Sequence, residues 1–210
     1  MKQRKKTNAR RPETREAILE AAFETFSQYG YDGTTTRGIC DRAGVNVSTL
    51  HYYYGDKEQL WLAACDLYHR RIREIIRESA DFTAPPEEAL PQFLGAVFDA
   101  FAQRPELLRI NLWITLESEW LDYEKTRDHL DPLVETGAAY LEKCQEAGMV
   151  KDIDVYAVLT LVSAQLIYSL AQGRAHSHLF GTGLSDPEFR AMLKKGFMKS
   201  ALTLIGLDED

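Results

Sequence analysis

The sequence predicts an all-α protein, and three observations lead to that fold class. Apolar residues recur at helical spacing of three and four positions along most of the 210 residues. No stretch shows the bounded β-branched alternation that is typical of a strand. Glycines and prolines interrupt the helical pattern at intervals, as helix ends require. With 45% hydrophobic and 27% charged residues, the composition is that of an ordinary globular protein.

The first three predicted helices are close together in the sequence. The stretch "TREAILEAAFETFSQYG" has apolar residues at helical spacing and then Gly30, which predicts a helix over 13–29. Next, "DGTTTRGICDRAG" indicates a loop, a threonine cap and a short helix that ends at Gly44. "VSTLHYYYG" then predicts a second short helix.

A long helix and a bundle are expected in the rest of the chain. Asp56 is placed to cap a helix over 57–79, and the prolines of "TAPPEEALP" mark a hinge. Five further helices are expected near 88–103, 105–120, 122–147, 153–174 and 186–206. We therefore divide the chain into a basic disordered arm (1–12), a helix-turn-helix domain (13–57) and a C-terminal helical domain (58–210).

The net charge of −7 is unevenly distributed. Residues 1–57 carry 10 Lys and Arg against 7 Asp and Glu, a balance of +3, whereas residues 58–210 carry a balance of −10. Seven of those ten positive residues lie among the first 15. A basic end on an acidic body favours a polyanionic partner at that end only, although a basic tail without a partner is the alternative.

Several classes of protein are disfavoured. No apolar run is long enough to span a membrane, and no apolar core of a signal peptide follows the basic start, so we expect a cytoplasmic protein. Cys40, Cys65 and Cys144 are widely spaced, which indicates reduced thiols in the core. No nucleophile, base and acid stand at a recognisable spacing and no phosphate-binding loop occurs, so we expect neither an enzyme nor a cofactor.

Residues 36–54 have the pattern of a helix-turn-helix. This unit needs apolar anchors, a small residue where the helices touch and a turn residue that tolerates positive φ. Ile39, Val45 and Leu50 supply the anchors, Cys40 the small side chain and Gly44 the turn. A plain helical hairpin is the alternative.

The second short helix separates into two faces on a helical wheel at about 100° per residue. Leu50 and Tyr54 face inward, while Ser48 and Tyr52 point directly away. Thr49 and Tyr53 lie on one flank of the outward face, and His51 lies on the other. Hydroxyl and phenol groups donate to phosphate oxygens, and small residues let a helix enter a major groove. This face therefore suits DNA, although exposed aromatic residues also mark protein interfaces.

Residues 14–64 resemble the DNA-binding domain of the tetracycline repressor (TetR) family. The resemblance rests on "GY" after the first helix, "TTTR", "AGV", "STLHYYY" and "DKE". It implies a dimer that binds a palindromic operator and whose C-terminal helices bind a small molecule that controls DNA affinity. Two positions depart from the usual family pattern, because His51 replaces a tyrosine and Tyr54 replaces a phenylalanine.

The resemblance also implies roles for individual residues. Contacts to base edges or to the groove are implied for Arg37, Val47, Ser48 and His51, and contacts to the DNA backbone for Thr36, Thr49, Tyr52, Tyr53 and Lys57. Arg37 suits a bidentate contact to guanine, because the guanidinium fork matches the O6 and N7 acceptors. Its alternative role is an ion pair with Asp41. For Lys57 the alternative is a plain solvated lysine.

The last two predicted helices suggest the dimer interface. "IDVYAVLTLVSAQLIYSLAQG" is apolar nearly all round, so one of its faces is expected to contact something outside its own domain. The following helix has a stripe of apolar and small residues, which with its copy predicts a four-helix interface; an ordinary monomer core is the alternative. The stripe consists of Phe189, Leu193, Gly196, Phe197, Ser200, Ala201 and Leu204.

Aromatic residues in the C-terminal domain suggest an effector pocket. Together with polar residues inside apolar runs, they predict an apolar or aromatic small molecule, although an ordinary core is the alternative. The predicted pocket residues are Phe93, Phe98, Asn111, Trp113, Thr115, Trp120, Tyr140, Gln165 and Tyr168. The "HSH" at 176–178 is read as solvated or capping histidines, and no metal is expected.

The function predicted from these patterns is a DNA-binding repressor that acts as a dimer and leaves its operator when an effector binds. Two alternatives stay open at this point. One is a constitutive DNA-binding protein without an effector, and the other is an enzyme housed in residues 80–210.

Overall fold

The computed structural model of the protein describes residues 6–117, 132–172, 175, 178–179 and 181–207. Every regular element in this part of the chain is a helix, which confirms the all-α prediction. The chain divides into two compact units. Unit 1 comprises Met1–Arg70 with Arg109–Thr126, and unit 2 comprises Arg71–Leu108 with Arg127–Asp210.

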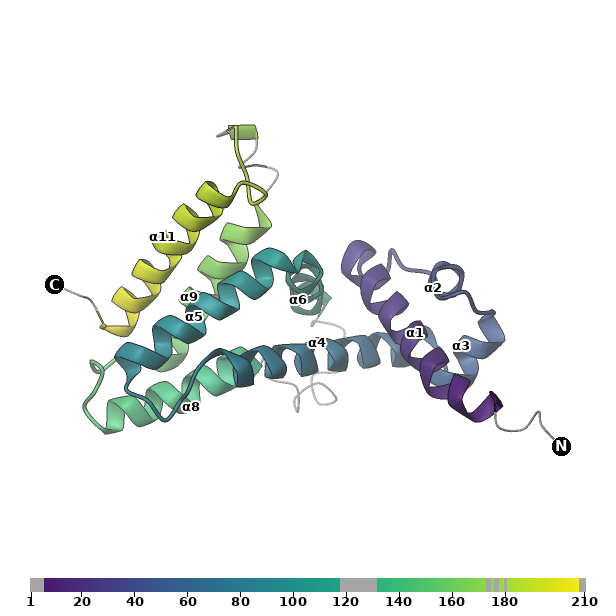
Figure 1. Ribbon diagram of the computed structural model, residues 1–210, viewed down its shortest axis with the longest axis horizontal. Coiled ribbons are helices and arrows are strands. Elements are labelled where there is room, and N and C mark those ends of the chain that lie inside the picture. The colour runs from purple at the N-terminus through teal and green to yellow at the C-terminus, as the bar shows by residue number, and fades with distance from the viewer. Residues whose placement is uncertain (1–5, 118–131, 173–174, 176–177, 180, 208–210) are drawn as a thin grey trace. The chain divides into compact units, whose positions relative to one another are not determined.

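Unit 1 contains the short helices. Helix α1 spans Lys6–Tyr29, α2 spans Thr36–Ala43 and α3 spans Val47–Tyr54; the unit also takes in the beginning of α4 (Lys57–Ser79) and the end of α6 (Pro105–Glu117). Figure 1 shows α2 and α3 in succession beside α1. Helix α1 begins earlier than the expected residue 13, and it continues through Pro12.

An aromatic cluster forms much of the core of unit 1. The rings of Phe26 and Trp61 meet edge to face with centroids 5.0 Å apart, and the Tyr31 ring lies 6.0 Å from that of Trp61. Ile39 and Leu50 are fully buried. Each large apolar side chain buried in this way stabilises the fold by roughly 1.5 to 3 kcal/mol. Two of the three predicted anchors, Ile39 and Leu50, are therefore core residues, whereas Val45 is partly exposed.

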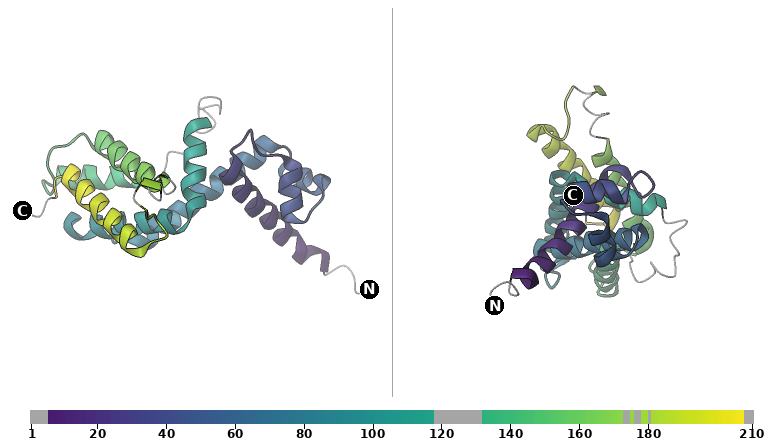
Figure 2. Two further views of the ribbon diagram at one scale, coloured as in Figure 1. Left: turned by 90° about the horizontal axis from the view of Figure 1, so that it is seen from above. Right: turned by 90° about the vertical axis from the view of Figure 1, so that its right-hand side faces the viewer.

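Unit 2 is a bundle of longer helices. Its principal helices are α5 (Pro86–Gln103), α8 (Pro132–Glu146), α9 (Val155–Ala171) and α11 (Pro187–Ile205). Figures 1 and 2 show α11 lying along α5 and α9. Helices α9 and α11 have polar N-caps, since Asp154 accepts from the N–H of Ala157 and Asp186 accepts from that of Glu188. All three cysteines are buried and reduced, as expected.

The proline-rich segment is not a boundary between the two units. Helix α4 ends before it, but Pro85 is the N-cap of α5 and Pro86 its first residue, so both sides belong to unit 2. Proline suits the first turn of a helix because the N–H that it lacks has no intrahelical partner there. Packing instead divides the chain inside α4, after Arg70, and inside α6, after Leu108. The functional boundary that we placed after residue 57 stays a prediction.

Candidate nucleic-acid interface

Local capping fixes the turn between α2 and α3. The Oγ1 of Thr35 accepts from the N–H of Gly38 (3.1 Å), which starts α2. Gly44 ends this helix at φ 67° and donates its N–H to the carbonyl of Cys40. Only glycine adopts this left-handed conformation without a steric cost, so the predicted role of Gly44 in the turn is confirmed.

Helix α3 begins at a cap that the sequence analysis missed. The Oδ1 of Asn46 accepts three hydrogen bonds, from the backbone N–H of Thr49 (2.8 Å) and from the hydroxyls of Ser48 (2.7 Å) and Thr49 (2.8 Å). Asparagine is among the preferred N-cap residues, so its position directly before "VST" was the available signal. In this state both hydroxyls present lone pairs outward, and each must rotate to donate to a phosphate.

The two predicted faces of α3 are confirmed by burial. Leu50 is fully buried and Tyr54 is 8% exposed, whereas Tyr52 is 71% exposed and Val47 39% exposed. Ser48 and His51 are also exposed, and the flank residues Thr49 and Tyr53 are partly buried. The rings of Tyr52 and Tyr53 meet edge to face with centroids 5.1 Å apart. A helix with buried anchors therefore presents an outward strip of polar and aromatic groups.

Tyr54 fastens the end of α3 to α1. Its hydroxyl donates to the backbone carbonyl of Arg15 (2.9 Å), and the Arg15 guanidinium lies 5.5 Å from the centre of its ring. Burial raises the pKa of Tyr54, the largest of several influences on that hydroxyl, so the group stays protonated as a donor. The hydroxyl of Tyr54 thus links α3 to α1 by a hydrogen bond that a phenylalanine at this position could not form.

His51 is held by the loop that follows α3. Its Nδ1 contacts the carbonyl of Gly55, which can only accept, so Nδ1 carries the hydrogen. In neutral imidazole this arrangement leaves Nε2 as an acceptor. His51 is exposed, so that acceptor is available to a partner.

Arg37, Thr36 and Lys57 lie at the starts of helices. Arg37 is exposed, and within the described residues it forms no ion pair with Asp41, which removes the alternative role that we considered. Thr36 is the first residue of α2 and Lys57 the first of α4, and both are partly buried. The Lys57 ammonium lies 4.2 Å from the centre of the Tyr31 ring, so it is not a plain solvated lysine.

The predicted effector-pocket residues are divided between the two units. Asn111, Trp113 and Thr115 belong to unit 1, whereas the other five described members belong to unit 2. The buried Asn111 donates to the Tyr68 hydroxyl (2.7 Å), and the exposed Thr115 donates to a carbonyl of its own helix. Trp113 packs its ring against Gly30. Trp120 lies outside the described residues, as do His176 and Ser177 of the "HSH" segment.

In unit 2 some of the predicted pocket residues pack in an aromatic cluster and another is exposed to solvent. Phe93 and Tyr140 both meet the Phe82 ring edge to face, at 5.3 and 5.2 Å, and the Tyr140 hydroxyl donates to the carbonyl of Ala84. Burial, ahead of the influence of Cys144, raises the pKa of Tyr140 to about 12. Tyr168 is 70% exposed. These residues are therefore partly core and partly surface, because helical spacing alone does not say which face is inside.

Gln165 and Phe98 complete the predicted pocket set. Gln165 is partly buried, and its Oε1 is buried with no hydrogen-bond partner among the described residues. Phe98 is fully buried and its ring centroid lies 5.7 Å from that of Phe197. A cavity of about 830 Å³ is present elsewhere in unit 2, and none of the nine predicted residues lines it.

The predicted dimer stripe on α11 requires a correction. Phe189, Phe197 and Ala201 are 9%, 3% and 0% exposed within the single chain, so they are core residues and not an available interface. The predicted stripe included too many residues, because an amphipathic helix in a bundle buries part of its apolar face within its own domain. Gly196 is exposed, and the partly exposed members are Leu193, Ser200 and Leu204.

Helix α9 has an exposed face without charged residues. Tyr156 is 61% exposed, Leu161 55% and Tyr168 70%, and Ala164 between them is also exposed. Helix α9 contains no Asp, Glu, Lys or Arg. An uncharged apolar face of this kind marks an interaction surface, as expected for a helix that is apolar nearly all round.

Comparison with known proteins decides the family. The sequence model described as "Bacterial regulatory proteins, tetR family" matches residues 18–64. A second model, "Tetracyclin repressor-like, C-terminal domain", matches residues 86–199, more than half of the chain. The chain belongs to the TetR family. The resemblance noted for residues 14–64 is thereby confirmed and extended into unit 2.

Individual TetR relatives are similar over most of their length. The transcriptional repressor NicS from Pseudomonas putida is 24% identical over 183 residues, which cover 85% of each chain. The transcriptional regulator RutR from Escherichia coli is 27% identical over 157 residues, 71% of this chain and 70% of RutR. A TetR regulator from Haloarcula marismortui superposes with a TM-score of 0.68 at 17% identity, covering 92% of this chain and 97% of that one.

The protein is therefore a DNA-binding transcriptional regulator of the TetR family. Among the residues that the structure describes, no helix combines the length and apolarity needed to cross a bilayer. The curated relatives are regulators of transcription.

Proposed function

We propose that this TetR regulator is a repressor that binds a palindromic operator as a homodimer and leaves it when a small molecule binds. The proposed DNA contacts come from α2, α3 and the start of α4. They are Thr36, Arg37, Val47, Ser48, Thr49, His51, Tyr52, Tyr53 and Lys57.

The observation that carries this proposal is the burial pattern of α3. The helix is anchored from behind by Leu50 and Tyr54, and it exposes Ser48, His51 and Tyr52 together on the other side. The phenol of Tyr52, which is 71% exposed, and the neighbouring histidine carry hydrogen-bonding groups that suit the edges of bases and phosphate oxygens. The width of the major groove, about 12 Å, admits a single helix of this kind.

Arg37 and Lys57 have different roles in this proposal. Arg37 is exposed and has no ion pair with Asp41, so its guanidinium fork is available for the O6 and N7 of guanine. Lys57 begins α4, where the unpaired N–H groups and the helix dipole already favour a phosphate. The Tyr31 ring beneath its ammonium restricts where that charge lies. Arg37 thus selects a base, and Lys57 adds affinity for any sequence.

The proposed dimer uses α9 and one flank of α11. Helix α9 offers Tyr156, Leu161 and Tyr168, which are all more than half exposed. On α11 the partly or fully exposed Leu193, Gly196, Ser200 and Leu204 lie on the side away from Lys194, whose ammonium pairs with Asp99 of α5. The helix-turn-helix domains of the two protomers need a separation of about 34 to 36 Å, or a multiple of it, to enter successive major grooves of the DNA. A ligand that changes this separation changes DNA affinity.

We assign effector binding to unit 2. We also propose that the protein acts in the cytoplasm and that it regulates transcription without catalysing a reaction. The curated relatives NicS and RutR carry the names of a repressor and a regulator, which supports this assignment. An apolar or aromatic effector remains our expectation. The predicted pocket residues within unit 2, such as Phe93 and Gln165, are the first positions to examine in a complex.

Selection of bound duplexes from a random DNA pool tests the proposal. The full chain should enrich a sequence with two inverted half-sites, and small apolar compounds added to the complex should release it. Enrichment of a site that no compound releases would favour a constitutive DNA-binding protein. No preference for any duplex at low salt would contradict the DNA-binding role of α3.

A further inference from the structure

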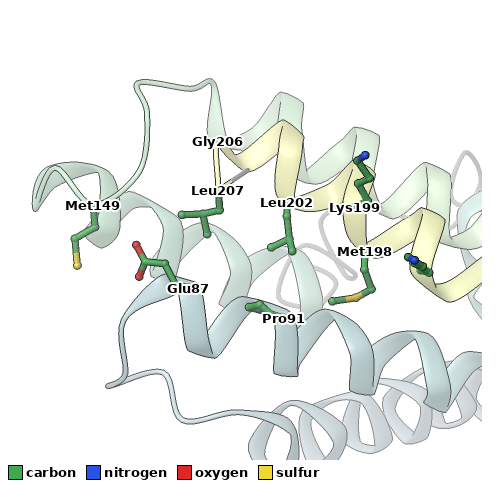
Figure 3. Close-up of a pocket in the computed structure, with 9 residues that line it drawn as sticks. Glu87, Pro91, Met149, Met198, Lys199, Leu202, Gly206 and Leu207 are labelled. Atoms are coloured by element: carbon green, nitrogen blue, oxygen red, sulfur yellow. The ribbon is translucent and has the colours of Figure 1, made fainter. Parts of the chain in front are cut away.

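A groove in unit 2 has a chemical character that DNA binding and dimerisation do not use. The cavity of about 830 Å³ lies between α5, α11 and the turn after α8. Figure 3 shows Pro91 on one side, with Met198, Leu202 and Leu207 facing it from the other. The full lining is Glu87, Pro91, Met149, Lys195, Met198, Lys199, Leu202, Gly206 and Leu207. Its volume is within the usual range for a small-molecule site, roughly 300 to 1,000 Å³.

Charge is arranged along this groove. Lys195 and Lys199 are one helical turn apart on α11 and both exposed, and in Figure 3 the Lys199 side chain extends from α11 away from Pro91. Glu87 lies near Met149 and Leu207, away from Lys199. From Lys195 to Gly206 the groove follows α11 and its C-cap for roughly 16 Å, at 1.5 Å per residue. One end is therefore cationic, and the middle is apolar.

The apolar part of the groove suits a flexible chain. Met149 and Met198 carry unbranched thioether side chains, which adapt to irregular apolar shapes. Leucine and proline side chains complete the walls. Lysine has a flexible four-carbon stem, so an ammonium at the rim can fold over an anionic group without any movement of the backbone.

The groove stays open in the dimer that we propose. Met198 and Leu202 are each two positions from Ser200, which places them on roughly opposite sides of α11 at about 100° per residue. The ion pair of Lys194 with Asp99 fixes which side of α11 meets α5. A partner that covers Ser200 and α9 therefore leaves Met198 and Leu202 accessible, while Lys199 lies one turn from the proposed interface residue Gly196.

We propose that this groove binds an amphipathic organic carboxylate, with the carboxylate between Lys195 and Lys199 and an acyl chain over Pro91, Met198 and Leu202. This inference goes beyond the proposed function. It concerns binding by the protein alone, with or without DNA, and assumes no effect of the ligand on the operator.

Titration calorimetry of the full chain tests the proposal, with decanoate as the probe. Decanoate should bind, while decanol, acetate and decyltrimethylammonium should bind more weakly, because each lacks the charge or the chain. Lys195→Gln and Lys199→Gln should each weaken decanoate binding roughly two- to fivefold, as expected for an exposed charge contact. The matched control Lys143→Gln, on the exposed surface of α8, should leave it unchanged.

A change in the floor of the groove supplies an independent measurement. Leu202→Gln should weaken decanoate more than acetate, because it removes apolar contact and leaves both lysines. The thermal midpoint of every variant shows whether it is folded. Equal binding of decanol and decanoate, or equal losses in Lys143→Gln and the groove variants, would overturn the proposal. The proposal would also be overturned if decanoate did not bind and Leu202→Gln changed the oligomeric state of the protein. That result would show that the groove is a protein interface.

Discussion

At the scale of single residues, the recognition surface depends on side chains that act from behind it. Tyr54 is the clearest example, because its ring is buried while its hydroxyl reaches the backbone of Arg15 on another helix. The resemblance to the family implies phenylalanine at this position, and phenylalanine would fill the same space without the hydrogen bond. The phenol of Tyr52 is therefore exposed to a binding partner, whereas the phenol of Tyr54 stabilises the fold.

Tyr54→Phe should lower the free energy of unfolding by about 1 kcal/mol, because a buried hydrogen bond contributes about that much. Tyr52→Phe is the matched control, since its ring is 71% exposed, and it should leave stability unchanged. Urea denaturation monitored by circular dichroism measures both. A loss of stability in Tyr52→Phe as large as that in Tyr54→Phe would mean that the phenol of Tyr52 also supports the fold.

Arg37→Ala and Lys57→Gln should have different effects on DNA. Losing a bidentate contact to guanine costs about 1 to 3 kcal/mol and relaxes preference at one base pair. Losing a phosphate contact weakens all sequences alike and reduces the slope of log affinity against log salt by about 1. Fluorescence anisotropy with the selected site and with single-base variants distinguishes them. Uniform losses across sequences in both variants would remove Arg37 from base recognition.

At the scale of elements, α3 is a short helix whose start is fixed by one side chain. A helix of eight residues has little stability of its own, so the cap matters more than in a long helix. Asn46 supplies that cap and also orients the hydroxyls of Ser48 and Thr49, two of the proposed DNA contacts. Stability and recognition are therefore linked at this residue.

Asn46→Ala should destabilise the protein by about 1 kcal/mol and weaken DNA binding as well. Asn46→Asp keeps an acceptor at the cap, so stability should be retained, whereas DNA binding should fall because a carboxylate repels phosphates. Thermal denaturation and anisotropy on the same samples separate the two effects. Normal DNA affinity in Asn46→Asp would place this residue away from the DNA.

The contact of α6 with the turn after α1 in unit 1 also depends on one glycine. Gly30 has φ +70°, and a Cβ at this position would lie 2.8 Å from the Trp113 ring. Gly44 has a similar φ of +67° but nothing within 4 Å of a Cβ. The two glycines therefore share the same backbone requirement and differ in a single steric contact.

Gly30→Ala should cost more stability than Gly44→Ala. The left-handed conformation alone costs an alanine roughly 1 to 2 kcal/mol, and forcing atoms into a packed contact adds about 1 to 3 kcal/mol. Chemical denaturation of the two variants gives the difference. Equal losses would show that the contact with Trp113 relaxes without cost.

At the scale of the whole molecule, the regulator is expected to act through its oligomeric state. Helix α9 has an exposed apolar face and no charged residue, and only a second surface can remove that face from water. The dimer that we propose uses this helix, and burial within the single chain restricts the surface that α11 can contribute to its partly or fully exposed flank.

Leu161→Glu should weaken the dimer by about 2 kcal/mol or more, because it places an unpaired charge in the interface. Met149→Glu is the control, since Met149 is 45% exposed and lies outside α9. Sedimentation equilibrium gives the monomer–dimer constant for each, and operator affinity should fall only in the first. A dimer that tolerates Leu161→Glu would move the interface away from this face of α9.

The sequence by itself determined the fold class, the helix-turn-helix and the two faces of α3. Helical periodicity, the turn glycine at Gly44 and the anchors Leu50 and Tyr54 are local features, and local spacing fixes which side of a short helix is apolar. The cap at Asn46 is also local, although the sequence analysis missed it, whereas the tertiary structure decided the groove beside Lys195. It also decided that Phe197 is core and not interface. Those outcomes depend on which helices pack against one another. The spacing of apolar residues shows that one face of a helix is buried, but it does not show whether the same chain or a second protomer covers that face.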